Sequence, residues 1–240
     1  MLPYRLVIAK TTIKIYFYLI HYLVMAKAKE WKEAELMQHF QLKKIAGVQT
    51  PAMQEWLATE EVIFTPFEAT LFENTYQDGF ENIAFWAEED LKMYFISNVL
   101  RLGGLMNKDN KGYVGLFEKK LSAIVNQTKL TVRSDFMVAK GFKNIIEIPY
   151  FHFQEYKPQL NPTGEPMAQL LEAFLIGQTE NQKEMPLYGC EVIGKIWTFV
   201  VMEGKTYCTS VSFDATKRDD LLKIIAILRK FKEILETRLL

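Results

Sequence analysis

The sequence predicts an α/β core domain in which a mixed central β-sheet is flanked by helices. Three observations predict this fold class. Apolar residues recur at helical spacing on both sides of the middle of the chain, a period of two begins at Thr128, and short apolar segments joined by glycine turns follow Pro186. Helix-like and strand-like segments that alternate along one chain are typical of a sheet covered by helices.

The composition is that of a soluble globular protein rather than a disordered one. Hydrophobic residues make up 49% of the 240 residues, and 17 Phe and 11 Tyr provide large side chains for a core. The 29 basic and 29 acidic residues balance, so no net charge draws the whole molecule toward polyanions. Any surface that binds nucleic acid must therefore be local.

The cysteines and histidines argue against a disulfide framework and against a zinc site. Cys190 and Cys208 have neither the number nor the spacing of such sites, and the chain contains three histidines. We expect two buried thiols in a reducing compartment, and hence a cytoplasmic protein.

The first 24 residues are basic and apolar, and the sequence leaves their role open. They contain Arg5, Lys10 and Lys14 and no acid, and the apolar run over residues 15–26 is shorter than the about 20 residues that span a bilayer. The segment fits a signal peptide, an apolar surface helix or strand, or an extended reading frame upstream of a start at Met25. No membrane association is expected.

Residues 1–65 are expected to form a mostly helical extension, and residues 66–240 the core domain. The spacing of apolar residues predicts a helix over residues 30–45. Thr50-Pro51 has the residue types of an N-cap and a first helical position, which predicts a second helix through Leu57.

The core domain is expected to contain three long helices. The first follows from AEEDLKMYFISNVLRLGG, where apolar residues recur three to four apart before Gly103-Gly104 ends the helix. The second begins at Pro166, and the third is an amphipathic helix over residues 217–240. Residues 116–125 fit either a helix or a strand.

Two strands are predicted between these helices. Leu130, Val132, Phe136 and Val138 alternate with Thr131, Arg133, Asp135 and Met137. This pattern predicts a strand with one apolar face and with Asp135 on the more polar face. After a turn at residues 141–144, IIEIPYFHFQEYKP predicts a second, largely buried strand. The segments YGCEVIG, IWTFVVME and TYCTSVSF predict further strands, joined by turns at Gly194-Lys195 and Gly204-Lys205.

Glu155 and Lys157 end the second of these strands and project from the same face, because residues two apart in a strand point the same way. An acid precedes a lysine by two residues at six positions: Glu30, Asp90, Asp109, Glu118, Glu155 and Glu203. The other five fall in expected helices, in loops or in no clear strand. Glu155 also follows an acid of the preceding strand, Asp135, by 20 residues. We expect the two strands to be neighbours in one sheet, with both carboxylates on the same face.

SDFMVAKG followed by PYFHFQEYKP resembles the signature of the PD-(D/E)xK nuclease superfamily, with Ser134 where the signature prefers Pro. The segment EEDLKMYFISNVLRLGGL is similar to the helix that precedes the catalytic strands in the nuclease domains of type I restriction enzymes. That similarity places the motif acid at Glu88, or at Glu89 in an alternative register.

The segments that follow extend the resemblance to residues 87–240. MAQLLEAF resembles the helix after the motif in RecB-type members and places their Gln at Gln169, although Ala173 stands where Tyr is expected. LYGCEVIGKIWTFVV resembles the strands that close the core. Residues 1–65 lie outside the resemblance.

The resemblance implies a restriction-endonuclease-like core and a Mg²⁺- or Mn²⁺-dependent nuclease that acts on DNA, with RNA left open as a substrate. The implied catalytic residues are Glu88, Asp135, Glu155, Lys157 and Gln169, and the implied metal ligands are Asp135, Glu155, the Tyr156 carbonyl and Glu88. Lys157 would orient a water or contact the phosphate, and Gln169 would position Lys157 or the substrate.

Phosphodiester hydrolysis needs a nucleophilic water and positive charge near the phosphoryl and leaving oxygens, and a metal ion held by carboxylates provides both. Oxygen ligands suit Mg²⁺ and Mn²⁺. Two alternatives stand beside this interpretation. The charged residues are merely solvated, or the chain is an inactive module of the same fold that binds nucleic acid or a protein partner. The oligomeric state is left open.

Overall fold

The computed structural model describes residues 29–45, 50–106, 111–182 and 184–240. Residues 31–240 form one compact unit. The basic, apolar segment over residues 1–24 lies outside the described residues, so the three interpretations of it stay open. No helix in the described ranges is long and apolar enough to cross a membrane.

The described strands form one mixed sheet of eight strands in the order β1-β7-β6-β5-β4-β3-β2, with β8 paired to β6. Strands β4 and β5 run parallel, as do β1 and β7, and the other neighbours are antiparallel. The strands are β1 (Lys43–Ile45), β2 (Tyr113–Val125), β3 (Thr128–Phe142), β4 (Ile145–Lys157), β5 (Leu187–Ile193), β6 (Ile196–Glu203), β7 (Thr206–Thr209) and β8 (Phe213–Asp214).

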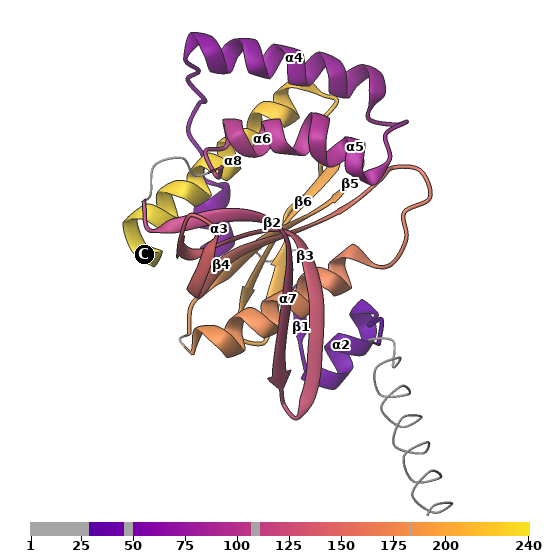
Figure 1. Ribbon diagram of the computed structural model, residues 1–240, viewed down its shortest axis with the longest axis vertical. Helices are drawn as coiled ribbons and strands as arrows, with labels where there is room; N and C mark the ends of the chain where they lie inside the picture. The colour runs from indigo at the N-terminus through magenta and orange to yellow at the C-terminus, as the bar shows by residue number, and fades with distance from the viewer. Residues whose placement is uncertain (1–28, 46–49, 107–110, 183) are drawn as a thin grey trace, which may run out of the picture. The chain divides into compact units, whose positions relative to one another are not determined.

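Helices cover both faces of this sheet (Figure 1). They are α2 (Glu33–Phe40), α3 (Pro51–Leu57), α4 (Pro66–Asn82), α5 (Glu88–Asp90), η1 (Leu91–Ile96), α6 (Ser97–Leu102), α7 (Pro166–Asn181), α8 (Arg218–Ile234) and η2 (Leu235–Leu239). One core lies between the sheet and α3, α4, η1, α6 and α8. A second core lies on the other face, beneath α2 and α7. The predicted α/β class, a mixed sheet flanked by helices, is confirmed.

The long helix predicted before the strands is confirmed over α5, η1 and α6. Its middle turns, η1, are wound more widely than an α-helix, and it ends at Gly103. Helix α4 packs closely on it at Gly79, where a Cβ atom would lie 2.5 Å from the Phe95 ring. Both thiols, Cys190 and Cys208, are buried and free, as the sequence predicted.

The first predicted helix is correct only in part. Helix α2 ends at Phe40 because Gln41 adopts a left-handed conformation (φ 59°), and residues 43–45 then form β1 beside β7. The prediction of a helix over residues 30–45 is therefore wrong in its last third. Pairing of β1 with residues 206–208 is a long-range interaction that local spacing does not reveal.

The second predicted helix, α3, forms as expected, and Thr50 Oγ1 accepts a hydrogen bond from the Met53 N–H over 3.3 Å. Trp56 of this helix is fully buried and donates its indole N–H to the Ile227 carbonyl over 2.9 Å. The domain boundary expected at residue 65 falls between α3 and α4, inside the compact unit.

Residues 116–125, which fitted a helix or a strand, belong to strand β2. The prediction that one face of β3 is apolar throughout is wrong. Leu130 and Val132 lie in the core beneath α7, whereas Phe136 and Val138 lie in the opposite core. The change occurs where Glu118 of β2, with a φ of 55°, interrupts the ladder beside Asp135. Strand β4 is buried only from Phe151 onward.

Glu172 in α7 predicts a pH-dependent stability. Its side chain is buried, and burial raises its pKa to about 7. The folded protein therefore loses stability as the pH rises from about 4.5, the unfolded value, through 7, by roughly 3 kcal/mol in total. Glu172→Gln removes this dependence, so urea denaturation should find the variant more stable than the native protein at pH 8 and equal to it near pH 4.5.

A matched control lies on the same helix. Glu180→Gln changes the charge equally at a less buried position, and it should leave the pH dependence unchanged. Equal pH profiles for the native protein and Glu172→Gln would contradict the assignment of a buried, protonated carboxyl.

Candidate active site

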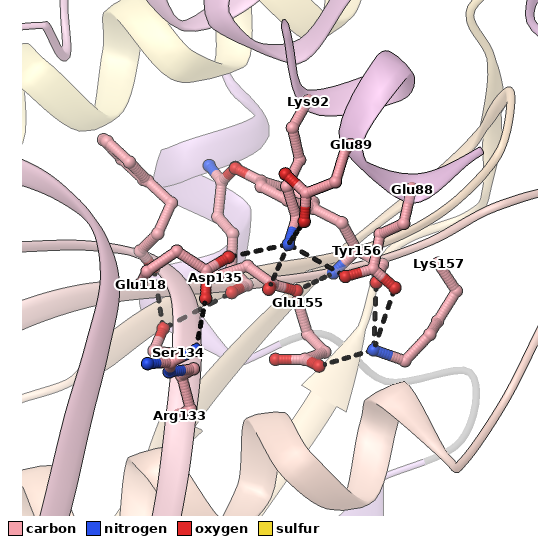
Figure 2. Close-up of polar contacts among 12 residues, drawn as sticks. Glu88, Glu89, Lys92, Glu118, Arg133, Ser134, Asp135, Glu155, Tyr156 and Lys157 are labelled. Carbon is pink, nitrogen blue, oxygen red and sulfur yellow. Dashed lines mark hydrogen bonds and ion pairs between the residues drawn. The ribbon is translucent and has the colours of Figure 1, made fainter. Parts of the chain in front are cut away.

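The strands that carry Asp135 and Glu155 are neighbours in the sheet, as the sequence predicted. Strands β3 and β4 are antiparallel, and the register that pairs Phe136 with Gln154 places Asp135 opposite Glu155. Opposite residues of an antiparallel pair lie on one face, with Cβ atoms about 5 Å apart. Both carboxylates are buried, at 5% and 3% exposure, and they lie in the cluster of charged side chains that Figure 2 shows.

The carboxylate of Asp135 is fixed by two hydrogen bonds. Oδ1 accepts from the Lys92 ammonium over 2.8 Å, and Oδ2 accepts from the Tyr156 backbone N–H over 2.7 Å. Burial raises the pKa of this carboxyl, and the two donors oppose that rise. The backbone of β4 and the helix above the sheet thus hold Asp135 in one orientation.

Glu155 and Lys157 form an ion pair within β4. The Lys157 ammonium donates to Glu155 Oε1 over 2.8 Å and to the Tyr156 carbonyl over 3.0 Å. Within the described part of the chain, no hydrogen bond reaches the other oxygen, Oε2 of Glu155. Burial, together with repulsion from Asp135, raises the pKa of Glu155 to about 8 against the attraction of Lys157. The positive charge of Lys157 therefore does not fully offset burial of Glu155 and its repulsion from Asp135.

Helix α5 brings Glu88 to this cluster. Its Oε1 lies 2.8 Å from the Lys92 ammonium, and its Oε2 lies 3.9 Å from the Lys157 ammonium. The alternative residue, Glu89, has a side chain that is 82% exposed and lies 4.0 Å from Lys92. Of the two registers that the resemblance allowed, the geometry favours Glu88.

Lys92 is a part of the cluster that sequence reasoning missed. Its ammonium donates to Glu88, Glu118 and Asp135 over 2.8, 2.7 and 2.8 Å, which uses all three of its N–H groups (Figure 2). Burial acts to lower its pKa, but the three hydrogen bonds outweigh burial and raise it. A lysine four residues after Glu88 on one helix shares its face, and this spacing could have indicated Lys92.

The expectation that Glu118 lies in no clear strand is wrong. It lies in β2 beside Asp135 and accepts a hydrogen bond from Lys92. Attraction to Lys92 and Arg133 outweighs partial burial and lowers the pKa of Glu118. Glu203, set aside as a loop residue, is the last residue of β6.

No hydrogen bond between described residues joins Gln169 to the cluster. Its side-chain oxygen is buried without a hydrogen-bond partner, and no hydrogen bond joins its amide to Lys157 among the described residues. Its expected role toward Lys157 or the substrate stays a prediction.

The donor set fits a hard divalent cation. Glu88, Glu118, Asp135 and Glu155 supply four carboxylates against the ammonium groups of Lys92 and Lys157. All of these donors are oxygens, as Mg²⁺ and Mn²⁺ prefer. In the described ranges, no three acidic, histidine or cysteine side chains converge on one ion position. The ammonium groups of Lys92 and Lys157 contact these carboxylates. An ion that binds Oδ1 of Asp135 would compete with the Lys92 ammonium for that oxygen.

No protein-family model matches the chain, and no curated protein matches it. The residues and geometry of this cluster are therefore what indicates a function.

Proposed function

We propose that the chain is a Mg²⁺-dependent nuclease of the PD-(D/E)xK superfamily that hydrolyses phosphodiester bonds of DNA. One observation carries the proposal. A buried aspartate, Asp135, lies on one strand opposite the glutamate of a Glu-x-Lys pair, Glu155 and Lys157, on the next strand. The combination is specific because all three groups are ionisable, nearly inaccessible and adjacent, and burying ionisable groups is costly unless they serve a function.

A restriction-endonuclease-like core is part of this proposal. The order of elements supports it: a helix that carries Glu88, three antiparallel strands, the helix α7, and then β5 parallel to β4. This is the order in which the sequence segments resemble the superfamily. The helix before the strands supplies Glu88 to the carboxylates of β3 and β4.

In the proposed hydrolysis, different residues of the chain would bind the metal ion and position the attacking water. Asp135 and Glu155 would hold the ion, with the Tyr156 carbonyl and Glu88 as further oxygen ligands. When bound, the ion supplies positive charge at the phosphate and lowers the pKa of a water. The Lys157 ammonium donates two hydrogen bonds, to Glu155 and to the Tyr156 carbonyl. Its third N–H is therefore available to hold the attacking water or a phosphate oxygen.

A second candidate function follows from Lys92. Because its ammonium satisfies three carboxylates at once, the cluster is partly neutralised without any metal ion. This arrangement favours an inactive module of the same fold that binds nucleic acid or a protein partner. The two candidates differ in whether the carboxylates bind a divalent cation.

Calorimetric titration with Mn²⁺ separates the two candidates. The nuclease predicts binding by the native protein that Asp135→Asn weakens more than about 100-fold, beyond the 10–100-fold loss typical of residues that only support metal ligands. Glu147→Gln is the matched control, since Glu147 is an exposed acid on the same strand as Glu155. Absence of binding that depends on Asp135 would favour the inactive module.

Lys92→Met should destabilise the protein in the absence of divalent cations and make its stability strongly dependent on Mg²⁺. The substitution leaves Asp135 and its neighbours without their cation, and breaking a buried ion pair costs about 3 kcal/mol or more. Added Mg²⁺ replaces the lost charge. Thermal denaturation with and without excess Mg²⁺ should therefore give a larger stabilisation for Lys92→Met than for the native protein. Equal shifts would mean that Lys92 and the ion do not share these carboxylates.

A further inference from the structure

The hairpin formed by β2 and β3 carries a local concentration of positive charge. Residues 119–133 contain Lys119, Lys120, Lys129 and Arg133 and no acid, in a chain whose formal net charge is zero. In a protein with balanced charges, this segregation marks the hairpin as a place where an anion could bind.

Three pairs of opposite residues form the outer face of this hairpin: Lys120 with Arg133, Ser122 with Thr131, and Ile124 with Lys129. The alternate residues, among them Leu121 and Val132, are buried in the core beneath α7. Lys120, Lys129 and Arg133 are exposed. The outer face is therefore mostly polar and open to solvent, with Ile124 as its exposed apolar residue.

The charges on this face are poorly compensated. Lys120 lies directly opposite Arg133, and like charges at opposite positions of an antiparallel pair are destabilising. Neither Lys120 nor Lys129 forms an ion pair with any residue in the described ranges. The guanidinium of Arg133 lies 3.5 Å from Glu118, whose carboxylate also accepts from Lys92. Such an arrangement is stabilised when a polyanion neutralises it.

Protection of a sheet edge explains the positive charge of this face only in part. Strand β2 is at the edge of the sheet, and lysines on edge strands prevent pairing with other chains. Lys129 and Arg133, however, belong to β3, which lies between β2 and β4. Edge protection does not require positive charge there.

We propose that the outer face of the β2–β3 hairpin binds phosphate groups of the nucleic acid strand that is cut. This inference rests on the proposed function and adds the surface that delivers the substrate. The outer face of the hairpin adjoins the candidate active site, because Arg133 contacts Glu118 and Glu118 contacts Lys92. The four residue-to-residue steps from Lys129 to Arg133 span about 13 Å, which corresponds to about four base-pair steps of about 3.4 Å each.

Fluorescence anisotropy with a short labelled DNA duplex tests this surface. Binding is measured in buffer with a chelator, so that no cleavage takes place. The double variant Lys120→Gln/Lys129→Gln should bind about 10-fold more weakly than the native protein, and the slope of log affinity against log salt should fall by about 2, the value for two lost phosphate contacts.

The charge-matched control is Lys140→Gln/Lys143→Gln, which removes two exposed lysines at the other end of β3 and in the following turn. It should bind within about twofold of the native protein, since phosphate contacts act locally. Equal losses for both double variants would mean that only net charge matters and would overturn the proposal. Unchanged binding by Lys120→Gln/Lys129→Gln would overturn it as well.

A duplex RNA of the same sequence is run beside the DNA, because phosphate contacts alone do not distinguish the two. A loss of affinity confined to Lys120→Gln/Lys129→Gln, for either duplex, supports the surface. Thermal denaturation should find that variant at least as stable as the native protein, since it relieves repulsion between Lys120 and Arg133. Binding is measured without cleavage, so the two proposals fail separately. Unchanged binding by Lys120→Gln/Lys129→Gln would not contradict the nuclease proposal, and a native protein that cleaves no DNA could still be tested for binding.

Discussion

Replacing Glu155 by Gln is expected to reduce Mg²⁺-dependent cleavage of supercoiled plasmid DNA by roughly 10⁴-fold. Gln keeps the size of the side chain and removes its charge. The loss follows because the charge stabilisation supplied through a metal ion is worth several kcal/mol, and each 1.36 kcal/mol changes a rate about tenfold. Glu155 is 3% exposed and lies opposite Asp135, so no neighbouring water can easily replace its carboxylate.

The control for this result is Glu147→Gln, which changes the same strand at an exposed position and should cleave at the native rate. Cleavage by Glu155→Gln at the native rate would mean that the activity belongs to a contaminant or to another site.

Lys157→Met is expected to reduce cleavage by about 10²–10⁴-fold, the contribution typical of a positioned acid–base group. The variant should still bind Mn²⁺, because both carboxylates remain. Met preserves the apolar part of the buried side chain and removes the ammonium that contacts Glu155 and Tyr156. Nicking rates and calorimetric Mn²⁺ affinities, measured side by side, separate the two effects.

Lys140→Met is the matched control for this variant, since it removes an exposed lysine of β3, and it should leave both quantities unchanged. Joint loss of Mn²⁺ binding and cleavage in Lys157→Met would show instead that Lys157 only holds the carboxylates in place.

Features that depend on short stretches of chain were predictable from the sequence. The parity of residues in a strand places Glu155 and Lys157 on one face, and the short turn after β3 makes its pairing with β4 a local event. The helix over α5, η1 and α6 follows from apolar spacing and from the glycines that end it.

Features that depend on distant segments were not predictable. Strand β1 forms because residues 206–208 lie beside it. Lys92 acquires its role only when β2 and β3 bring Glu118 and Asp135 to its helix. The positive φ of Glu118 and the change of core along β3 arise at the same place, where β2 and β3 contact Lys92 of the preceding helix. Local periodicity contains no information about contacts between segments that are far apart in the sequence.

The most direct test of the proposed function is the nicking of supercoiled plasmid by native protein and by Asp135→Asn, purified in parallel and assayed with Mg²⁺ and with a chelator. The proposal predicts that native protein nicks the plasmid only with Mg²⁺ and that Asp135→Asn does not nick it under either condition. Equal nicking by Asp135→Asn and native protein, or no nicking by native protein on DNA or RNA, would contradict it.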